Sequence, residues 1–453
     1  MERFGKTGYK KEATEKRDRY TKHFEMNDGS FKMYSSPGSM HYQTATGWEE
    51  IDLTIHSNTT GVHGSNPYFN GDNSFKTYYP QSPMSGKVYT KVKDGEMSER
   101  IEGLYATDAN GNTVYQYQAN TPQGVEVNTN HITYTNLFPN TQVVYAQQAD
   151  GRKFAIQLQS AQALSGLPAN AKFLVIKEKV TIPANWTVTQ TEGYINLFSG
   201  STWVANYVKP TAIEKNSADK HYDNEEDLMS EGTMRMTRIG NELTIYTQFS
   251  VEWLKAANRQ FPVMLDPTTN YYPPSPVLPN TPTTSMVTGR LTSATGAKTS
   301  GFLRMAAAGT FSWAKFNIAT LPAGATISAA TYWGYQYSPA GTAVDKTTSV
   351  VGMQTVDPEV ATNSAATPLI SNQINVTGPV YSTTYVFGGT NPAAAPFTWR
   401  SAALTGNATG DIAAQQVSQG WTALGFRYTS GNTGTMLQNG IEIFATTPTL
   451  CLI

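Results

Sequence analysis

The chain has 453 residues, which is enough for two or three domains that each bury a core of their own. Its formal net charge of −1 leaves no overall field that would attract nucleic acid or an anionic membrane. No stretch reaches the roughly 20 apolar residues that a membrane-spanning helix needs. The only cysteine, Cys451, excludes disulfides within the chain and cysteine-based zinc clusters.

Residues 1–29 form a charged N-terminal arm of mixed sign, poor in large apolar residues. Such a segment is expected to be exposed and to become ordered only against a partner, and a plain solvated tail is an equal alternative. No apolar segment follows its basic residues, so no signal peptide is visible. This pattern favours a protein that leaves the cell by lysis, as virion proteins do; a removed signal or a cytoplasmic protein are the alternatives.

Residues 30–267 read as a β-rich domain of short strands separated by turns such as Asn27-Asp28-Gly29 and Asn110-Gly111-Asn112. Residues 250–260 predict one helix, with Ser250 as its N-cap and Pro262 after its end. The expected strands are Phe31–Tyr34, His41–Tyr42, Ile51–Ile55, Lys87–Val92, His131–Leu137, Gln142–Tyr145, Lys153–Leu158, Lys172–Ile176 and Leu243–Ser250.

Residues 268–284 are rich in proline and predict a stiff, extended linker. Composition changes here, because only 12 of the 67 charged residues lie from position 268 onward. Residues 285–453 predict a second β domain, with short helices at 360–367 and 410–420. Its expected strands are Phe311–Phe316, Thr326–Tyr337, Ser349–Thr355, Thr384–Phe387, Ala423–Tyr428 and Gly440–Phe444. The predicted fold class is all-β: two or more β-sandwich, jelly-roll-like domains, a Pro-rich linker and few short helices.

Four segments carry a resemblance to known modules: Thr21–Phe24 and Asn27–Ser30 with Met40–Tyr42 and Gly47–Asp52; Tyr134–Thr141 with Gly151–Lys153; Phe249–Leu254 with Phe261–Thr268; and Ala314–Asn317 with Leu321–Ala330. The first three are similar to the N-terminal β domain of bacterial cell-wall-associated, YD-repeat-type surface proteins. The fourth resembles a DNRLRE-like β-sandwich module. This resemblance implies a β-sandwich fold, a surface location and a role in adhesion or assembly, and it brings no catalytic residues.

Candidate site residues are few. Trp333, Tyr335 and Tyr337 alternate along one expected strand and could form a carbohydrate platform, although alternating aromatic residues more often line a buried face. The histidines make no metal-binding pair; His56 and His63 lie in one loop and are a poor metal site. The acidic run 223–227 is interpreted as a solvated loop rather than a calcium site. No catalytic residue, cofactor or metal is predicted.

The sequence therefore predicts a non-catalytic structural or adhesion protein that works outside a cell. It would be a virion component (fibre, decoration or tail-associated) or a microbial surface protein. Expected partners are other copies of the chain or other structural proteins, and glycan is a further possibility; nucleic acid and a membrane span are not expected. The alternatives from other classes are a carbohydrate-binding module and a polysaccharide-degrading enzyme carried on β-sandwich domains.

Overall fold

A computed structural model describes most of the chain. The described residues are 8–92, 95–191, 193–214, 229–267, 269–271, 288–291, 298–300, 303–305, 311–322, 324–337, 346–354, 356–358, 361, 369–387, 397–427 and 434–446. Within them strands dominate, and the three α-helices have 4, 4 and 11 residues. The expected all-β fold with several sheets and few short helices is confirmed.

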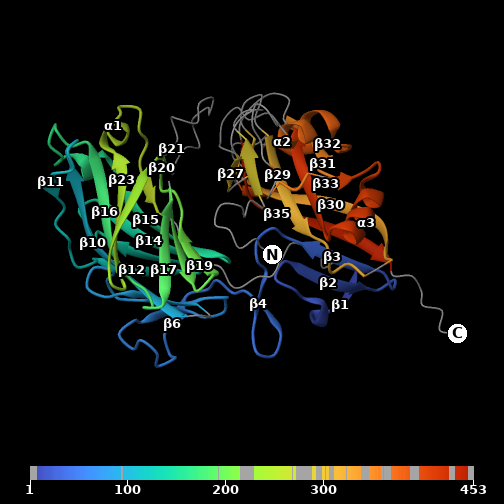
Figure 1. Cartoon of the computed structure of the whole chain (residues 1–453), viewed down its shortest axis with the longest axis horizontal. Coiled ribbons are helices and arrows are strands. Elements are labelled where there is room, and N and C mark those ends of the chain that lie inside the picture. The colour runs from blue at the N-terminus through green and yellow to red at the C-terminus, as the bar shows by residue number, and fades with distance from the viewer. Residues whose placement is uncertain are drawn as a thin grey trace. The chain divides into compact units, whose positions relative to one another are not determined.

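The chain divides into two compact units (Figure 1). The split unit is formed by residues 1–49 and 283–453, and the inserted unit by residues 50–217 and 224–282. This division differs from the expected one, because residues from both ends of the chain contribute to the split unit. The expected linker, residues 268–284, lies outside the described residues except for 269–271, which form a strand of the inserted unit.

Two sheets pack against each other in the split unit. Buried side chains from both sheets meet between them, including Phe316, Tyr332 and Phe426. The centre of the Tyr332 ring lies 6.4 Å from that of Phe316 and 4.8 Å from that of Phe426. Sheet A contains β1 (Tyr9–Glu12), β2 (Thr21–Met26), β3 (Phe31–Ser35), β35 (Gly434–Thr446), β30 (Thr326–Tyr337) and β33 (Phe397–Leu404), with β28 (Leu303–Met305) beside β35. Sheet B contains β27 (Lys298–Ser300), β26 (Thr288–Leu291), β29 (Phe311–Asn317), β34 (Trp421–Arg427), β31 (Lys346–Gly352) and β32 (Val380–Phe387).

Short elements complete the split unit. A second apolar cluster, containing Trp313, Met353 and Ile374, includes residues of sheet B, α2 and η5. The expected helix at 410–420 is present as α3, whereas most of the one expected at 360–367 lies outside the described residues. These elements are α2 (Leu369–Asn372), η5 (Gln373–Thr377), α3 (Ala408–Ser418), η1 (Thr14–Lys16), and β4 (His41–Gln43) paired with β5 (Trp48–Glu50).

The N-terminal segment is a three-stranded meander that extends sheet A. Strand β3 pairs antiparallel with β35, with Met33 opposite Ile443, and Figure 1 shows the blue N-terminal strands beside the red C-terminal strand. Thr21 and His23 on β2 are fully buried, and the His23 Nε2 lies 3.1 Å from the Thr320 hydroxyl. The expectation of an exposed arm over residues 1–29 is therefore wrong for the described residues 8–29. Alternate residues of this charged segment face the core, and pairing with β35 satisfies its backbone.

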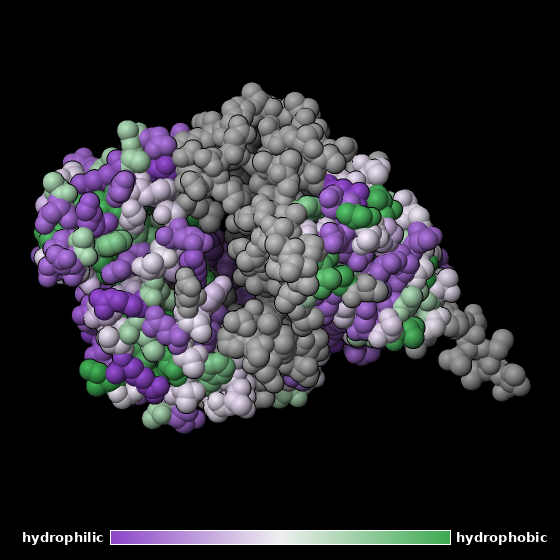
Figure 2. Space-filling model, turned by 45° about the horizontal axis from the view of Figure 1, so that its top comes forward, coloured by the Kyte–Doolittle hydropathy of each residue, from purple (hydrophilic) through white to green (hydrophobic). Residues whose placement is uncertain are grey.

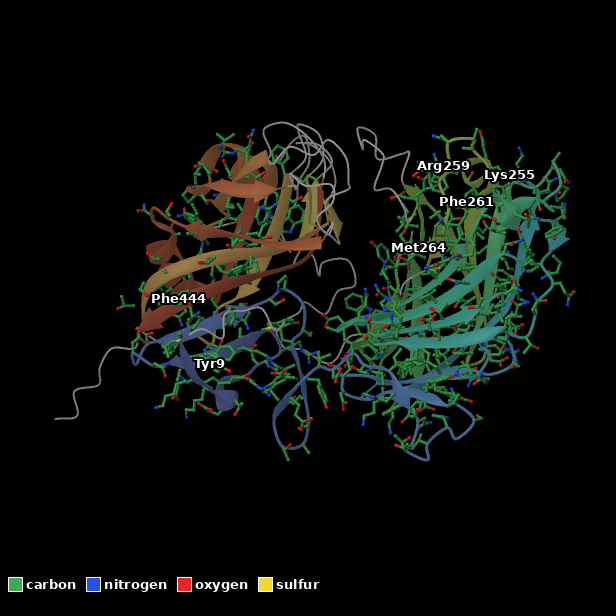
Figure 3. All side chains as sticks on the ribbon, turned by 180° about the vertical axis from the view of Figure 1, so that it is seen from behind. Tyr9, Lys255, Arg259, Phe261, Met264 and Phe444 are labelled. Carbon is green, nitrogen blue, oxygen red and sulfur yellow. The ribbon has the colours of Figure 1, made fainter. Side chains whose placement is uncertain are left out.

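The face of the meander that points away from the core carries aromatic rings. Tyr9, Phe24 and Tyr34 make successive edge-to-face contacts, with ring centroids 5.3 Å and 5.6 Å apart. The Lys32 ammonium lies 4.3 Å from the centre of the Phe444 ring on β35, and Figure 3 labels Tyr9 and Phe444 on this unit. Lys32 and Tyr34 are both buried, so these contacts hold the meander in place.

The inserted unit is a sandwich of two large sheets. Sheet C contains β22 (Thr233–Ile239), β23 (Glu242–Ser250), β16 (Phe173–Thr181), β10 (Gly95–Thr107), β9 (Val88–Val92), β8 (Lys76–Tyr79), β7 (Tyr68–Asn70) and β6 (His56–Ser57), with β11 (Thr113–Gln116) beside β10. Sheet D contains β12 (Gly124–Asn128), β13 (His131–Thr135), β14 (Thr141–Gln147), β15 (Gly151–Leu158), β25 (Thr269–Tyr271), β19 (Thr202–Tyr207), β18 (Tyr194–Ser199) and β17 (Trp186–Thr191), with β24 (Val263–Asp266), β20 (Thr211–Glu214) and β21 (Met229–Glu231).

Local signals in the inserted unit agree in part with expectation. Ser250 caps α1 (Val251–Leu254) by accepting a hydrogen bond from the Trp253 amide at 3.2 Å, but the helix ends after four residues. η2 (Ala161–Leu164) is a second short helical element among the described residues of this unit. The segment 51–55, expected to be a strand, is irregular.

Side chains close one corner of this sandwich. The Gln190 amide, on edge strand β17, donates to the Met234 carbonyl at 3.0 Å and accepts from the Met236 amide at 3.2 Å. Both backbone groups belong to β22, the edge strand of the other sheet. The Gln190 side chain thus makes the bonds that a neighbouring strand would make, which protects this edge from pairing with other chains.

Candidate functional site

Glu99 and Glu178 are two of the buried carboxylates of the inserted unit, and their surroundings decide whether they could act on a substrate. Glu99 on β10 forms an ion pair with Arg152 on β15 and accepts a hydrogen bond from the Tyr207 hydroxyl at 2.6 Å. Arg152 also donates to the Thr90 hydroxyl at 2.7 Å. Glu99 and Arg152 are 4% and 1% exposed, so this network is sealed between the sheets.

Glu178 on β16 is a further buried carboxylate. It is 5% exposed, and its Oε2 has no hydrogen-bond partner within the described part of the chain. Burial raises the pKa of Glu178 to about 7, although the positive charge of Arg152 opposes this. Arg152 is already paired with Glu99, so one cation serves two carboxylates. Glu178 is consequently a neutral acid near and below neutral pH.

This buried polar layer separates two apolar clusters of the sandwich. Along β10, Met97 belongs to one cluster and Ile101 to the other, with Glu99 between them. Along β16, Ile176 and Val180 bracket Glu178 in the same way. The layer therefore fixes the register of the core, and neither carboxylate reaches solvent where a saccharide could contact it.

The outer face of sheet C offers accessible polar chemistry. We call the set Arg100, Glu102, Tyr105, Lys177, Lys179, Arg235, Glu242 and Tyr246 the basic face; these residues come from the adjacent strands β10, β16, β23 and β22. They point away from the core because each alternates with a core residue of its strand. Arg235, Tyr246 and Lys177 lie directly opposite one another in one row across three strands.

Arg235 is positioned by an aromatic ring. Its guanidinium carbon lies 4.0 Å from the centre of the Tyr246 ring, a stacked cation–π arrangement. Arg235 is exposed and Tyr246 is half-buried. Burial raises the pKa of Tyr105, with Tyr246 as a second cause, and Arg235 opposes this effect. The two phenols and the guanidinium therefore act on one another electrostatically.

Ion pairs organise the remaining charges of the basic face. Arg100 donates to Glu102 through Nε at 3.1 Å, and Lys177 lies 3.8 Å from the other oxygen of the same carboxylate. Lys179 pairs with Glu242 at 2.9 Å. The set holds four cations and two carboxylates, so the face is positive although the chain as a whole has a net charge of −1. Figure 2 shows hydrophilic residues mixed with smaller apolar ones on the visible face of both units.

The predicted aromatic row lies on β30 of the split unit. Trp333 is half-buried and pairs with Ser401 and Gly440 on the neighbouring strands, while its neighbour Tyr332 faces the core. The side chains of Tyr335 and Tyr337 lie outside the described residues. The carbohydrate platform on Trp333, Tyr335 and Tyr337 therefore stays a prediction.

Two histidines of the split unit have structural surroundings. His23 and His41 are buried, and burial is the main reason that the pKa of each is lowered to about 4. His41 Nδ1 lies 2.6 Å from the Asp18 carbonyl oxygen. Both side chains are thus neutral at pH 7.

Two histidines of the inserted unit have different surroundings. His63 stacks on Tyr89 with centroids 3.8 Å apart and lies 2.9 Å from a Glu96 oxygen. His56 lies near Asp52 and Asp72, all three exposed, with ligand atoms within 4.8 Å of one another. Cys451 and the acidic run 223–227 lie outside the described residues.

A second buried ion pair holds the region after α1. Arg259 lies 2.9 Å from Glu214, with both side chains buried, and its guanidinium carbon lies 4.1 Å from the centre of a Trp253 ring. Lys255 donates to the Leu167 carbonyl at 3.1 Å. Figure 3 labels Lys255 and Arg259 together with Phe261 and Met264. These contacts attach the chain after α1 to the sandwich.

Comparison with known proteins adds little. No family model matches the chain, and no curated protein matches it. One similar solved structure is that of a Paenibacillus xanthan lyase, with a TM-score of 0.11 and 10% identity, over 94% of this chain. The chain spans about half the length of that protein, 52% of it. A likeness at this level carries no argument about fold or function. Within the described residues, no helix is both long and apolar enough to cross a membrane.

Proposed function

We propose that this chain is a non-catalytic structural or adhesion protein that works outside a cell, either as a virion component (fibre, decoration or tail-associated) or as a microbial surface protein. The observation that carries the proposal is the contrast between the two kinds of polar group in the inserted unit. Glu99 and Glu178 are sealed in the core, whereas the charges of the basic face lie on an open sheet face. This arrangement suits binding better than catalysis.

Three further features support the proposal. The all-β architecture, the low content of charged residues in the C-terminal part and the capped edge of β22 suit a durable protein exposed to its environment. The pairing of β3 with β35 joins the two ends of the chain in one sheet. A protein that bears load or survives outside a cell gains from such closure.

A carbohydrate-binding role is the second candidate, and the basic face favours it. Tyr246 and Tyr105 offer aromatic surface, while Arg235 and Lys177 offer donors beside it. The polysaccharide-degrading alternative would need an acid and a base that reach the glycosidic bond, and Glu99 and Glu178 do not meet this need.

The test is peptide mass spectrometry on separated fractions of the native source: released particles, cell surface and cytosol. Enrichment in particles supports a virion component, and enrichment on the cell surface supports a surface protein. Enrichment in the cytosol would refute both. In parallel, release of reducing ends from a panel of polysaccharides by the purified chain would contradict the non-catalytic assignment.

A further inference from the structure

The basic face of the inserted unit has more positive charge than its own carboxylates neutralise. Arg100 and Lys177 share Glu102, Lys179 pairs with Glu242, and Arg235 has no carboxylate partner within the described residues. We propose that the basic face binds a carboxylated saccharide, such as a uronate-containing segment of a surface polysaccharide. The proposal rests on the proposed function only in requiring that an adhesion protein has an accessible binding face.

Arg235 is the first anchor. The Tyr246 ring covers one side of its guanidinium, and Arg235 is exposed, so a ligand can reach this side chain. Arginine presents these groups as a planar fork that matches a carboxylate in a bidentate manner, and stacking reduces the conformational freedom lost on binding. An exposed arginine that is already held in place by a ring is suited to recognise an acidic ligand rather than to stabilise the fold.

The register of the strands extends this anchor into a row. Lys177 lies opposite Tyr246 and Arg235 lies opposite it on the other side, so the Cα atoms of Lys177 and Arg235 are about 10 Å apart at the usual strand spacing. In the neighbouring row Lys179 lies opposite Arg100. Two cations per row, separated by a tyrosine ring in one case, fit an extended ligand whose acidic groups recur along its length.

The neutral groups of the face favour a saccharide over other polyanions. Gln248 and Thr233 lie opposite each other in the next row, and Tyr105 lies two strands from Gln248 in the same row. Amide, hydroxyl and phenol groups can pair with sugar hydroxyls, and sugar rings can pack on tyrosine. A net charge of two on the face, four cations against two carboxylates, is small for a nucleic-acid surface, where many phosphate contacts carry affinity.

The experiment is titration calorimetry of the full chain with polygalacturonate, with its methyl-esterified neutral form and with a thymidine oligonucleotide. We expect binding to polygalacturonate, at least tenfold weaker binding to the neutral polymer, and weaker binding to the oligonucleotide. Arg235→Ala should weaken polygalacturonate binding by about tenfold, the size of one charge-assisted hydrogen bond, and Lys177→Gln should weaken it by several-fold. Lys10→Gln removes the same charge from the split unit and should change binding by less than about twofold.

Several outcomes would overturn the proposal: no binding to polygalacturonate, equal binding to the neutral polymer, tighter binding to the oligonucleotide, or wild-type binding by both Arg235→Ala and Lys177→Gln. These failures are distinct from failure of the proposed function. A chain found on particles that ignores polygalacturonate keeps the proposed function and loses this site. A cytosolic chain that binds polygalacturonate through Arg235 keeps the site and loses the proposed function.

Discussion

Replacement of Glu178 by glutamine should stabilise the inserted unit at alkaline pH. In the folded chain burial raises the pKa of Glu178 to about 7 from an ordinary 4.5. Below pH 4.5 the carboxyl is protonated in both folded and unfolded chains and has no effect. Between pH 4.5 and 7 the unfolded chain loses the proton first, so stability falls as pH rises. The loss is complete above about pH 7 and amounts to about 3 kcal/mol.

Glutamine keeps the shape of a protonated glutamate and cannot ionise. We therefore expect Glu178→Gln to match the wild type near pH 4.5 and to exceed it by up to about 3 kcal/mol at pH 8. The assay is hydrogen exchange of β16 and β10 amides in the full chain under conditions that report unfolding of this unit, corrected for the intrinsic pH dependence of exchange. Glu99→Gln is the matched control: it breaks the pair with Arg152 and should destabilise the unit at both pH values.

The reasoning is refuted if wild type and Glu178→Gln show the same pH dependence of stability between pH 5 and 8. That result would mean that the pKa of Glu178 is not raised by folding.

Three further predictions concern the two units separately. Arg152→Met should destabilise the inserted unit by about 3–5 kcal/mol in urea unfolding, because Glu99 is left buried without its cation. Adding Glu99→Gln should recover part of this loss. An unchanged urea midpoint in Arg152→Met would contradict the role of the pair. His23 behaves oppositely to Glu178, because its folded pKa of about 4 lies below the ordinary 6.5. His23 should therefore cost the split unit about 3 kcal/mol as pH falls from 6.5 to 4, in addition to the similar effect of His41, and His23→Gln should reduce this slope by about half. An unchanged slope in acid unfolding would contradict the burial of the His23 ring. Gln190→Ala should lower the free energy of unfolding of the inserted unit by about 1–2 kcal/mol, speed amide exchange in β22 and speed aggregation on heating. Unchanged exchange would show that groups other than Gln190 protect this edge.

Much of the fold can be predicted from the sequence because strand alternation and turn residues are local signals. The turn at Asn27-Asp28-Gly29 joins β2 to β3, and the predicted strand Thr326–Tyr337 has the bounds of β30. Strand β10 could not be recognised, because Glu99 at a core position breaks the apolar alternation. Its partner, Arg152, lies 53 positions away in the sequence, so local pattern does not indicate the pairing. A strand that carries one member of a buried ion pair is therefore not recognised from hydrophobic alternation.

The candidate site was less predictable than the fold. Lys177 and Lys179 alternate with buried residues in the sequence, which signals an outward charged face, but their match to Arg235 and Tyr246 depends on the register of three strands. The prediction for the N-terminal segment, residues 1–29, was wrong for a similar reason. Its alternation is weak, and its membership of sheet A is decided by a strand that ends at residue 446. Long-range pairing of this kind leaves no trace in local composition.

The pairing of β3 with β35 also sets the order in which the protein can be made. Translation must proceed about 400 residues beyond β3 before β35 exists, and at roughly 5–20 residues per second this takes about 20–80 seconds. During that interval the inserted unit can complete its sheets on the ribosome, whereas β3 lacks its partner β35. Met33 and Phe31, which the finished core buries, are then open to chaperones or to neighbouring nascent chains. Synthesis speed across the inserted unit is thus a determinant of yield, and a chain stalled before residue 434 would carry a finished inserted unit beside an incomplete split unit.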